Sequence, residues 1–345
     1  MAYTTIKKPS DYFNTKLYTG TGAELAITGV GFQPDWTWIK RRDAVANGGM
    51  FDNVRGATKL LSSSQTDGEQ TLAQSLKSFD SDGFTLGTGT NGYVNTSGST
   101  TVAWNWLASN TTASNTDGSI TSTVSANTTS GFSIVKYTGN DTAGATVGHG
   151  LGAIPKVIII KRYTDVRSWP VYHYSIGNGN KLYLDLNYAS ASSTNWNSTT
   201  PDSSVFTISE ASDVNGGGGA SDYIAYCFAE VKGFSKFGSY TANASTDGTF
   251  TYTGFKPAFL MIKSINLNEG WFMYDTKRST YNVVENFLLA HGSNAEETST
   301  ANSVDILSNG FKIRTTDSRL NSSGSYIYMA FAEEPLVGAN PCTAR

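Results

Sequence analysis

Short apolar runs alternate with stretches rich in Gly, Ser, Thr and Asn along this chain, and one such pattern occurs three times. Tyr18 to Lys40, Tyr137 to Lys161 and Tyr240 to Lys263 each begin with Tyr-Thr and pass through a polar loop into an apolar run ending in Ile-Lys. A proline precedes this Ile-Lys pair by the same interval in each copy, at Pro34, Pro155 and Pro257. Because spacing and apolar pattern recur together, the sequence indicates an internal repeat.

Each copy also closes with a similar aromatic strand. In VAWNWLA, IAYCFAE and YMAFAE, the residues Trp106, Phe228 and Phe331 hold equivalent places. Each unit therefore spans roughly 100 residues, a usual length for one domain. Many short strands between turn residues, with almost no helical period, predict an all-β chain of three tandem β-sandwich modules of jelly-roll type. The predicted order is an N-terminal arm (1–16), module 1 (17–108), a linker (109–131), module 2 (132–231), module 3 (234–334) and a C-terminal tail (335–345).

Large aromatic residues two positions apart share one face of a strand. This applies to Trp36 with Trp38 and to Trp104 with Trp106, and aromatic residues are enriched in half-buried strands. We therefore expect the four tryptophans to be buried core residues rather than ligand platforms. The same expectation holds for the aromatic residues of the other closing strands, Phe228 and Phe331.

Two segments depart from the repeat. Residues 66–77 are the one part of the first unit that favours a short helix, with Thr66 or Asp67 as its cap. In the linker, Ile120 to Val124 favours a short strand between turn-forming residues.

Composition excludes several classes of function. Charged residues make up 15% of the chain, compared with about 25% in an average soluble protein. The net charge is −3, so no basic surface for nucleic acid is expected. No apolar run approaches the roughly 20 residues of a membrane helix, and the first residues lack the apolar core of a secretion signal. Cys227 and Cys342 are expected to be free thiols rather than a disulfide framework.

Candidate chemistry is sparse. His149, His173 and His291 are far apart and match no catalytic or metal-binding spacing, and no phosphate-binding loop or nucleophile elbow occurs. Asp80-Ser-Asp82-Gly83 is similar to the start of a calcium loop, but it lacks the later oxygen ligands and the distal Glu. We expect an ordinary Asp-Gly turn there. No cofactor and no metal are predicted.

Two possibilities stay open for carbohydrate chemistry. A glycosidase needs two carboxylates across the scissile bond, and sequence spacing cannot exclude such a pair, although what recurs here is apolar strands and turns. Trp196 lies in the polar stretch SSTNWNSTT without an apolar neighbour. It is either a residue that stacks on a sugar or contacts a partner, or a loop anchor folded back on the sandwich.

Several stretches together resemble virion structural proteins of tailed phages, especially marine phages, which are commonly described as tail-fibre proteins. These stretches are GFQPDWTWIKRRD, FDSDGFTLGT, DGSITSTVSANTTSGFSIVKYTG, VGHGLGAIPKVIIIK and IYMAFAEEP, and the resemblance extends from about Tyr3 to Arg345. It implies β-rich modules on the virion exterior, often oligomeric, and supplies no catalytic residues.

The resemblance implies a non-enzymatic virion structural protein, a tail fibre or similar exterior appendage that contacts the host surface. A head fibre or capsid decoration protein is the first alternative, and a carbohydrate-binding or carbohydrate-active surface protein the second. The expected partners are other copies of the chain, with a trimer favoured, other virion proteins, and a host surface glycan or protein. Neither nucleic-acid binding nor membrane insertion is expected. The protein would be made and assembled in the cytoplasm of the infected host.

Overall fold

The computed structural model describes residues 4–89, 94–216, 218–219 and 221–336. Strands make up 44% of the chain and helices 2%, which confirms the predicted all-β class. The helices in the described residues are two single 3-10 turns, η1 (Pro9–Asp11) and η2 (Thr300–Asn302). The strands form several separate antiparallel sheets, and we group them into three modules: β1–β9 (module 1), β10–β19 (module 2) and β20–β28 (module 3).

Module 1 pairs one large sheet with one small sheet. The large sheet has the order β1-β9-β3-β4-β5-β6, and the small sheet the order β2-β8-β7. The strands are β1 (Phe13–Thr19), β2 (Leu25–Thr28), β3 (Trp36–Arg41), β4 (Gly49–Asp52), β5 (Lys59–Ser62), β6 (Gln70–Thr71), β7 (Leu76–Asp80), β8 (Gly83–Leu86) and β9 (Thr100–Trp106).

Module 2 repeats this plan with two additional strands at one edge. Its large sheet has the order β10-β11-β12-β19-β14-β15-β16-β17, and its small sheet pairs β13 with β18. The strands are β10 (Ala113–Asn115), β11 (Ser122–Asn127), β12 (Phe132–Thr138), β13 (Ala145–Gly148), β14 (Pro155–Arg162), β15 (Pro170–His173), β16 (Asn180–Tyr183), β17 (Ala191–Ser192), β18 (Val205–Ile208) and β19 (Asp222–Ala229).

Module 3 has the same strand order as module 1. Its large sheet is β20-β28-β22-β23-β24-β25 and its small sheet is β21-β27-β26. The strands are β20 (Ser235–Thr241), β21 (Phe250–Tyr252), β22 (Phe255–Ser264), β23 (Trp271–Asp275), β24 (Asn286–Leu289), β25 (Glu297–Thr298), β26 (Val304–Leu307), β27 (Gly310–Ile313) and β28 (Ser325–Pro335).

The recurring sequence motif occupies the same topological place in each large sheet. The strand that ends in Ile-Lys pairs with the closing aromatic strand on one side and with the next strand of the chain on the other. In register, Trp36 lies opposite Trp106, Val157 opposite Phe228, and Phe259 opposite Phe331.

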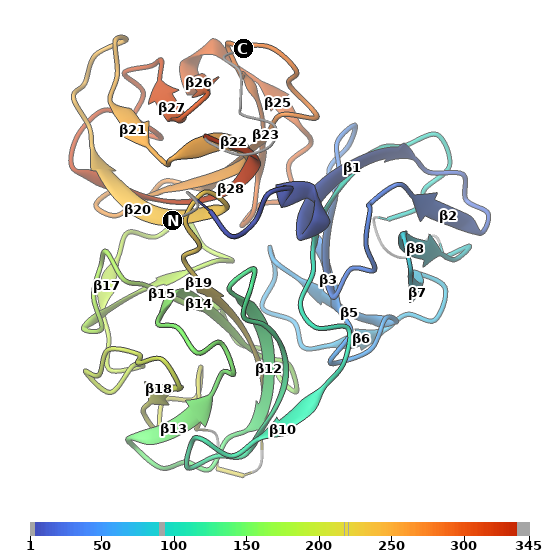
Figure 1. Cartoon of the computed structure of the whole chain (residues 1–345), viewed down its shortest axis with the longest axis vertical. Helices are drawn as coiled ribbons and strands as arrows, with labels where there is room; N and C mark the ends of the chain where they lie inside the picture. The colour runs from blue at the N-terminus through green and yellow to red at the C-terminus, as the bar shows by residue number, and fades with distance from the viewer. Residues whose placement is uncertain (1–3, 90–93, 217, 220, 337–345) are drawn as a thin grey trace.

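The large sheets are buried on both faces, which explains their continuous apolar runs. In β3, Trp36 and Trp38 pack on one face, while Ile39 packs on the other, against the small sheet of module 1. The faces that carry the tryptophans meet at the centre of the molecule, around which the three modules are arranged (Figure 1). We call this cluster the central core, and it includes the buried residues Phe13, Trp36, Trp38, Trp104, Trp106, Phe132, Val157, Ile159, Tyr226, Phe228, Phe259, Met261, Met329 and Phe331.

The prediction that the aromatic residues are buried is confirmed, because Trp36, Trp104, Trp106, Phe228 and Phe331 are each at most 1% exposed. Their location differs from the expectation of separate modules. Trp36 stacks on Tyr226 of module 2 at 4.6 Å between ring centroids, and Trp106 contacts Phe331 of module 3 at 5.6 Å. The modules therefore share one core in addition to a core of their own.

Three expectations on the local structure were wrong. The predicted arm 1–16 contains the start of β1 at Phe13 and buries Ile6 in the central core, since its apolar side chains complete that core. The predicted helix over 66–77 is absent. β6 and the start of β7 occupy this segment instead, because Leu76 is buried against the small sheet. The predicted linker 109–131 is part of module 2, because β10 and β11 extend its large sheet. The short strand predicted within it at Ile120 to Val124 overlaps β11.

The other predicted boundaries stay predictions. β28 runs to Pro335, and most of the predicted tail, with Cys342, lies outside the described residues.

Candidate functional site

The lysine that ends each repeated run is buried between two modules. Lys40, Lys161 and Lys263 are each 0% exposed. Each ammonium group donates to a backbone carbonyl of a neighbouring module: Lys40 to Gly292 (2.7 Å), Lys161 to Thr66 (2.7 Å) and Lys263 to Asn187 (3.3 Å). Module 1 thus bonds to module 3, module 2 to module 1, and module 3 to module 2. The contacts close a ring.

Burial changes the proton affinity of these lysines. It lowers the pKa of Lys40 and of Lys263 to about 7, and that of Lys161 to about 8. The charged form loses its hydration and regains only carbonyl hydrogen bonds, which is the ordinary reason for such a decrease.

A second set of polar residues joins modules at the end of the neighbouring strand. The carboxylate of Asp52 accepts from the hydroxyl of Tyr226 at 2.8 Å and from Arg55 at 2.6 Å. In module 3, Asp275 accepts from the indole of Trp104 at 3.1 Å and from Arg278 at 2.5 Å. The Asp-x-x-Arg spacing in both modules is a sequence signal for this bridge, and our sequence analysis missed it.

Module 2 places a histidine where the other modules have this aspartate. His173 lies opposite Val157, as Asp52 lies opposite Trp36. Its Nε2 is 3.4 Å from the carbonyl oxygen of Tyr328 in module 3. Burial lowers the pKa of His173 to about 4, so this imidazole is neutral near pH 7.

The loops that follow the Ile-Lys strands also cross to a neighbouring module. Ala46 N donates to Ser293 O at 2.7 Å, Arg167 N to Thr66 O at 2.9 Å, and Ser190 N to Ile265 O at 2.8 Å.

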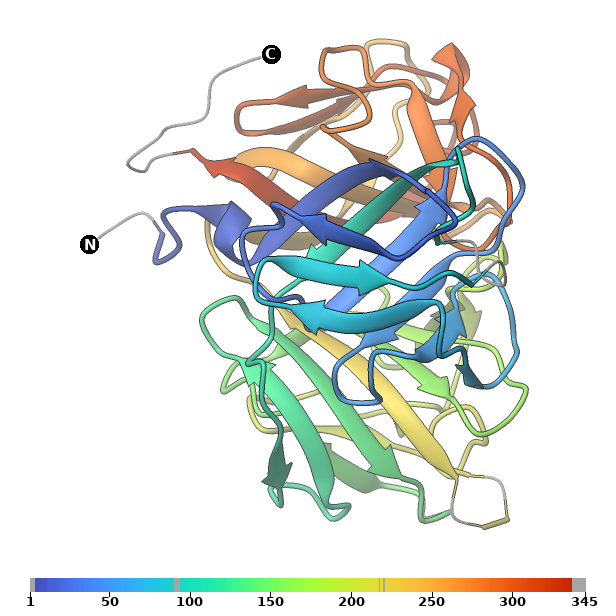
Figure 2. The ribbon, with the colours of Figure 1, turned by 90° about the vertical axis from the view of Figure 1, so that its right-hand side faces the viewer.

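The two described ends of the chain lie close to one side of the molecule. In Figure 2, β1 begins and β28 ends on the left-hand side, and β22 runs antiparallel to β28. The ends of the chain that the structure describes therefore lie on one face, which we call the terminal face.

Trp196 is a loop anchor. Its side chain is 1% exposed, it packs edge-on against Tyr172 at 5.5 Å, and its indole N–H donates to the carbonyl of Asn180 at 2.9 Å. Of the two alternatives predicted for Trp196, the loop anchor is therefore the one that the structure shows, and the ligand-binding alternative is wrong because the buried indole offers no face to a sugar. The polar neighbours in sequence form turns around it, so the local pattern alone could not distinguish the two alternatives.

The other candidate residues also have structural roles. His149 and His173 are buried, and His291 accepts the backbone N–H of Trp271 at 3.2 Å. Asp82 lies in the turn between β7 and β8, as predicted, and its carboxylate accepts the backbone N–H groups of Gly29 and Gly31.

The described residues contain no group of three or more His, Cys, Asp or Glu side chains placed to hold a metal ion. None of the helices in this part of the chain combines the length and apolar character that crossing a membrane requires.

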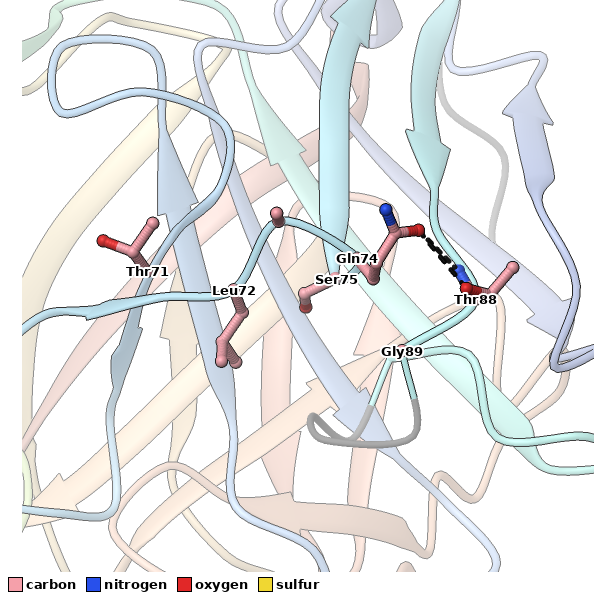
Figure 3. Close-up of a pocket in the computed structure, with 7 residues that line it drawn as sticks. Thr71, Leu72, Gln74, Ser75, Thr88 and Gly89 are labelled. Carbon is pink, nitrogen blue, oxygen red and sulfur yellow. Dashed lines mark hydrogen bonds between the residues drawn. The ribbon is translucent and has the colours of Figure 1, made fainter.

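The pocket in Figure 3 is a shallow hollow of about 380 Å³ on module 1, with a mixed polar and apolar lining. Its lining residues are Thr71, Leu72, Ala73, Gln74, Ser75, Thr88 and Gly89. Gln74 and Thr88 hydrogen-bond to each other across it. The lining offers neutral hydrogen-bonding groups and no titratable side chain, so it could hold a small polar ligand but supplies neither a general acid nor a general base.

The residues that recur, the buried lysines and the Asp-x-x-Arg pairs, join one module to the next. A family model described as Domain of unknown function (DUF7483) matches residues 8–335. The chain belongs to this family. The match begins just before η1 and ends at the last residue of β28, so it includes all three modules and the central core except Ile6. No curated protein and no solved structure matches the chain.

Proposed function

We propose that this member of the DUF7483 family is a non-enzymatic structural protein of a phage virion, an exterior appendage such as a tail fibre that contacts the host surface. The observation that carries the proposal is the ring of contacts between modules. The repeated lysines and the Asp52 and Asp275 bridges bind one module to the next, instead of converging on an open cleft. Residues used in this way favour a rigid body over a catalytic site.

The terminal face suggests how such a body would attach. Both described ends of the chain lie there, so one face can dock to the particle while the opposite loops point outward (Figure 2). A head fibre or capsid decoration protein would use the same arrangement and is the alternative. The proposal includes no catalytic activity, no cofactor and no essential metal.

We further propose a homo-oligomer, with a trimer favoured. Strand β21 of module 3 exposes two aromatic side chains, with Phe250 44% and Tyr252 52% exposed, and exposed apolar surface is typical of interaction sites. Light scattering on the purified chain measures its mass, and a stable monomer at high concentration would contradict the oligomer.

One observation favours the second alternative, a carbohydrate-binding surface protein. The exposed rings of Phe250 and Tyr252 lie on one face of the edge strand β21. The equivalent positions of module 1 are Ala26 and Thr28, because Thr28 lies opposite Gly83 as Tyr252 lies opposite Gly310. Module 1 has no aromatic pair at these positions, and in module 3 the pair lies beside Lys312. Two such rings can stack on a pyranose ring, and polar neighbours can then bind the hydroxyl groups of the sugar.

Locating the chain on intact particles tests the main proposal. Cryo-electron microscopy of the particle should show its density on the exterior, with the terminal face toward the virion. Density inside the head, or absence from purified particles, would contradict the proposal. Binding of host envelope polysaccharide to the purified chain, lost in Tyr252→Ala and kept in Thr28→Ala, would favour the carbohydrate-binding alternative.

A further inference from the structure

Lys181 occupies a position that the other two modules fill with a buried apolar side chain. In register, Leu182 lies opposite Val171 as Leu61 lies opposite Met50 and Leu288 opposite Met273. The residues one position earlier are therefore equivalent, and they are Leu60, Lys181 and Phe287. Leu60 is 4% exposed and Phe287 is 1% exposed, whereas the Lys181 side chain is 16% exposed.

Two further polar side chains meet the Lys181 ammonium group. Its Nζ is 3.3 Å from Oδ1 of Asn195 and 3.2 Å from Oδ2 of Asp213. Asn195 is 2% exposed, and its amide Nδ2 is buried without a hydrogen-bond partner. An unpaired buried N–H group costs free energy. The Asn195 amide therefore lies at Lys181 although its Nδ2 makes no hydrogen bond there.

Two hydroxyl groups complete the cluster. Ser193 donates to Oδ1 of Asn195 at 2.9 Å, so the amide oxygen receives hydrogen bonds from both Ser193 and Lys181. Tyr183 donates to Oδ2 of Asp213 at 3.0 Å, and its ring lies 4.6 Å from the lysine Nζ. The cluster thus contains an amine, an amide carbonyl held by two donors, and a carboxylate next to the amine.

We propose that Lys181 and Asn195 react to form an intramolecular amide bond, with Asp213 carrying the proton. Nζ of Lys181 is the nucleophile and Cγ of Asn195 the electrophile, an arrangement in which a positioned base activates an amine. Ser193 stabilises the negative charge that develops on Oδ1, as preorganised donors do for other tetrahedral intermediates.

The reaction balances without an oxidant or a co-reactant. Asp213 takes one proton from the Lys181 ammonium, and the neutral amine forms a bond to Cγ. The bond between Cγ and Nδ2 then breaks, and Nδ2 leaves as ammonia with the proton that Asp213 returns, while the attacking nitrogen gives up one proton. The products are a secondary amide between the two side chains and ammonia, which takes up the remaining proton as ammonium.

Module 3 gives the comparison without this chemistry. Ser299 accepts the N–H of Ala301 as Ser193 accepts the N–H of Asn195, so Ala301 is the equivalent of Asn195. Tyr240 donates to Leu320 as Tyr137 donates to Val214, so Arg319 is the equivalent of Asp213. Phe287, Ala301 and Arg319 cannot form this bond. The amine, the amide and the carboxylate therefore occur together in module 2. An ordinary ion pair would need only the amine of Lys181 and the carboxylate of Asp213, and not the amide of Asn195.

Intact-mass spectrometry of the purified full chain tests the proposal. The expected mass is lower than the sequence mass by one ammonia, about 17 Da. A trypsin digest should lack cleavage after Lys181 and give one peptide from Ser168 to Lys232 with the same loss. The full sequence mass together with normal cleavage after Lys181 would overturn the proposal, and this result needs no variant.

Variants identify the atoms involved. Lys181→Arg and Asn195→Ala should have their full masses, while Lys59→Arg, in module 1, should keep the loss. Asn195→Asp should lose one water, about 18 Da, because the leaving group changes. Asp213→Ala should slow or abolish the loss with Lys181 and Asn195 intact. A loss that persists in Asn195→Ala would place the reaction elsewhere, for instance at an Asn-Gly succinimide, and would also overturn the proposal.

Discussion

The indole N–H of Trp104 donates a hydrogen bond to the carboxylate of Asp275, which lies 171 residues further along the chain, at 3.1 Å. The guanidinium of Arg278, which pairs with the same carboxylate, lies 5.5 Å from the Trp104 ring. Module 1 and module 3 therefore share a fully buried polar contact as well as apolar surface. A contact of this kind forms only when both modules are folded, which couples their stabilities.

Truncation in the central core should destabilise the whole molecule. Trp106→Ala is expected to lower the free energy of unfolding by roughly 3–5 kcal/mol, because it removes a large buried ring that contacts module 3. Denaturant titration followed by circular dichroism and tryptophan fluorescence should show a single transition at a lower midpoint. Tyr281→Ala, at a position 80% exposed, is the control and should leave the midpoint unchanged. A transition of module 1 alone would contradict the shared core.

The buried acid–base pair should matter far more than an exposed one. Asp275→Ala removes one of the two carboxylates that pair with Arg278, whose side chain is 0% exposed, and leaves Glu296 as the other. Loss of a buried ion-pair partner costs up to about 3–5 kcal/mol. The matched control is Asp247→Ala, which breaks the pair with Lys312 at an aspartate 79% exposed. That change should cost about 0–1 kcal/mol. Equal effects of the two substitutions in thermal melts would count against a buried bridge.

Stability should increase with pH above neutrality. The pKa is about 7 for Lys40 and Lys263 and about 8 for Lys161 in the folded chain, below the ordinary lysine value of 10.5. Between these pH values the unfolded chain binds more protons, so raising the pH favours the folded state. From pH 7 to pH 9, each lysine should add at most about 1.4 kcal/mol per pH unit. Well below its folded pKa, the contribution of each lysine no longer changes.

A single substitution isolates this effect. Lys40→Met should reduce the slope of unfolding free energy against pH in that window, while Lys77→Met on the surface should leave it unchanged. The measurement is urea unfolding at half-unit intervals, kept below pH 9 so that ionisation of tyrosine does not contribute. An unchanged slope in Lys40→Met would show that this lysine remains charged in the folded chain.

The tyrosine that opens each repeat should contribute equally in the three modules. The hydroxyls of Tyr18, Tyr137 and Tyr240 donate to the carbonyls of Val94, Val214 and Leu320 at 2.6, 2.6 and 2.7 Å. Removing one hydroxyl leaves a carbonyl without its partner, so Tyr18→Phe, Tyr137→Phe or Tyr240→Phe should cost about 1–3 kcal/mol. Tyr281→Phe is the exposed control. If only one of the three substitutions destabilised the chain, the equivalence of these contacts would be refuted.

The sequence predicted the all-β class because its signals are local. The Pro-to-Ile-Lys interval and the closing aromatic strand mark equivalent strands, and period-two alternation placed Trp36 and Trp38 on one face. The same pattern could not tell which neighbour that face meets, since a strand buried on both sides has an apolar run whatever covers it. The shared core is a long-range property, and Trp36 packs on Tyr226 from another module.

The residues that bridge modules were harder to predict for the same reason. Lys40 ends an apolar run, and such a lysine usually faces water. Its burial depends on the carbonyl of Gly292, far along the chain. Residues 66–77 have helix-compatible spacing, but pairing of β6 with β5 and burial of Leu76 outweigh local propensity. The sequence could not decide whether Trp196 is exposed or buried, because Tyr172, on which it packs, lies on another strand.

The packing of Phe13 on Phe331, with ring centroids 5.1 Å apart, has a consequence for synthesis of the protein. A ribosome adds about 5–20 residues per second, and domains generally fold in the order in which they emerge. Here the first strand to emerge waits for the last strand before its ring is covered. Modules 1 and 2 can cover part of each other through Trp36 and Tyr226, but the aromatic surface that packs on Phe331 stays uncovered until β28 has been made. In this period the nascent chain is most exposed to aggregation.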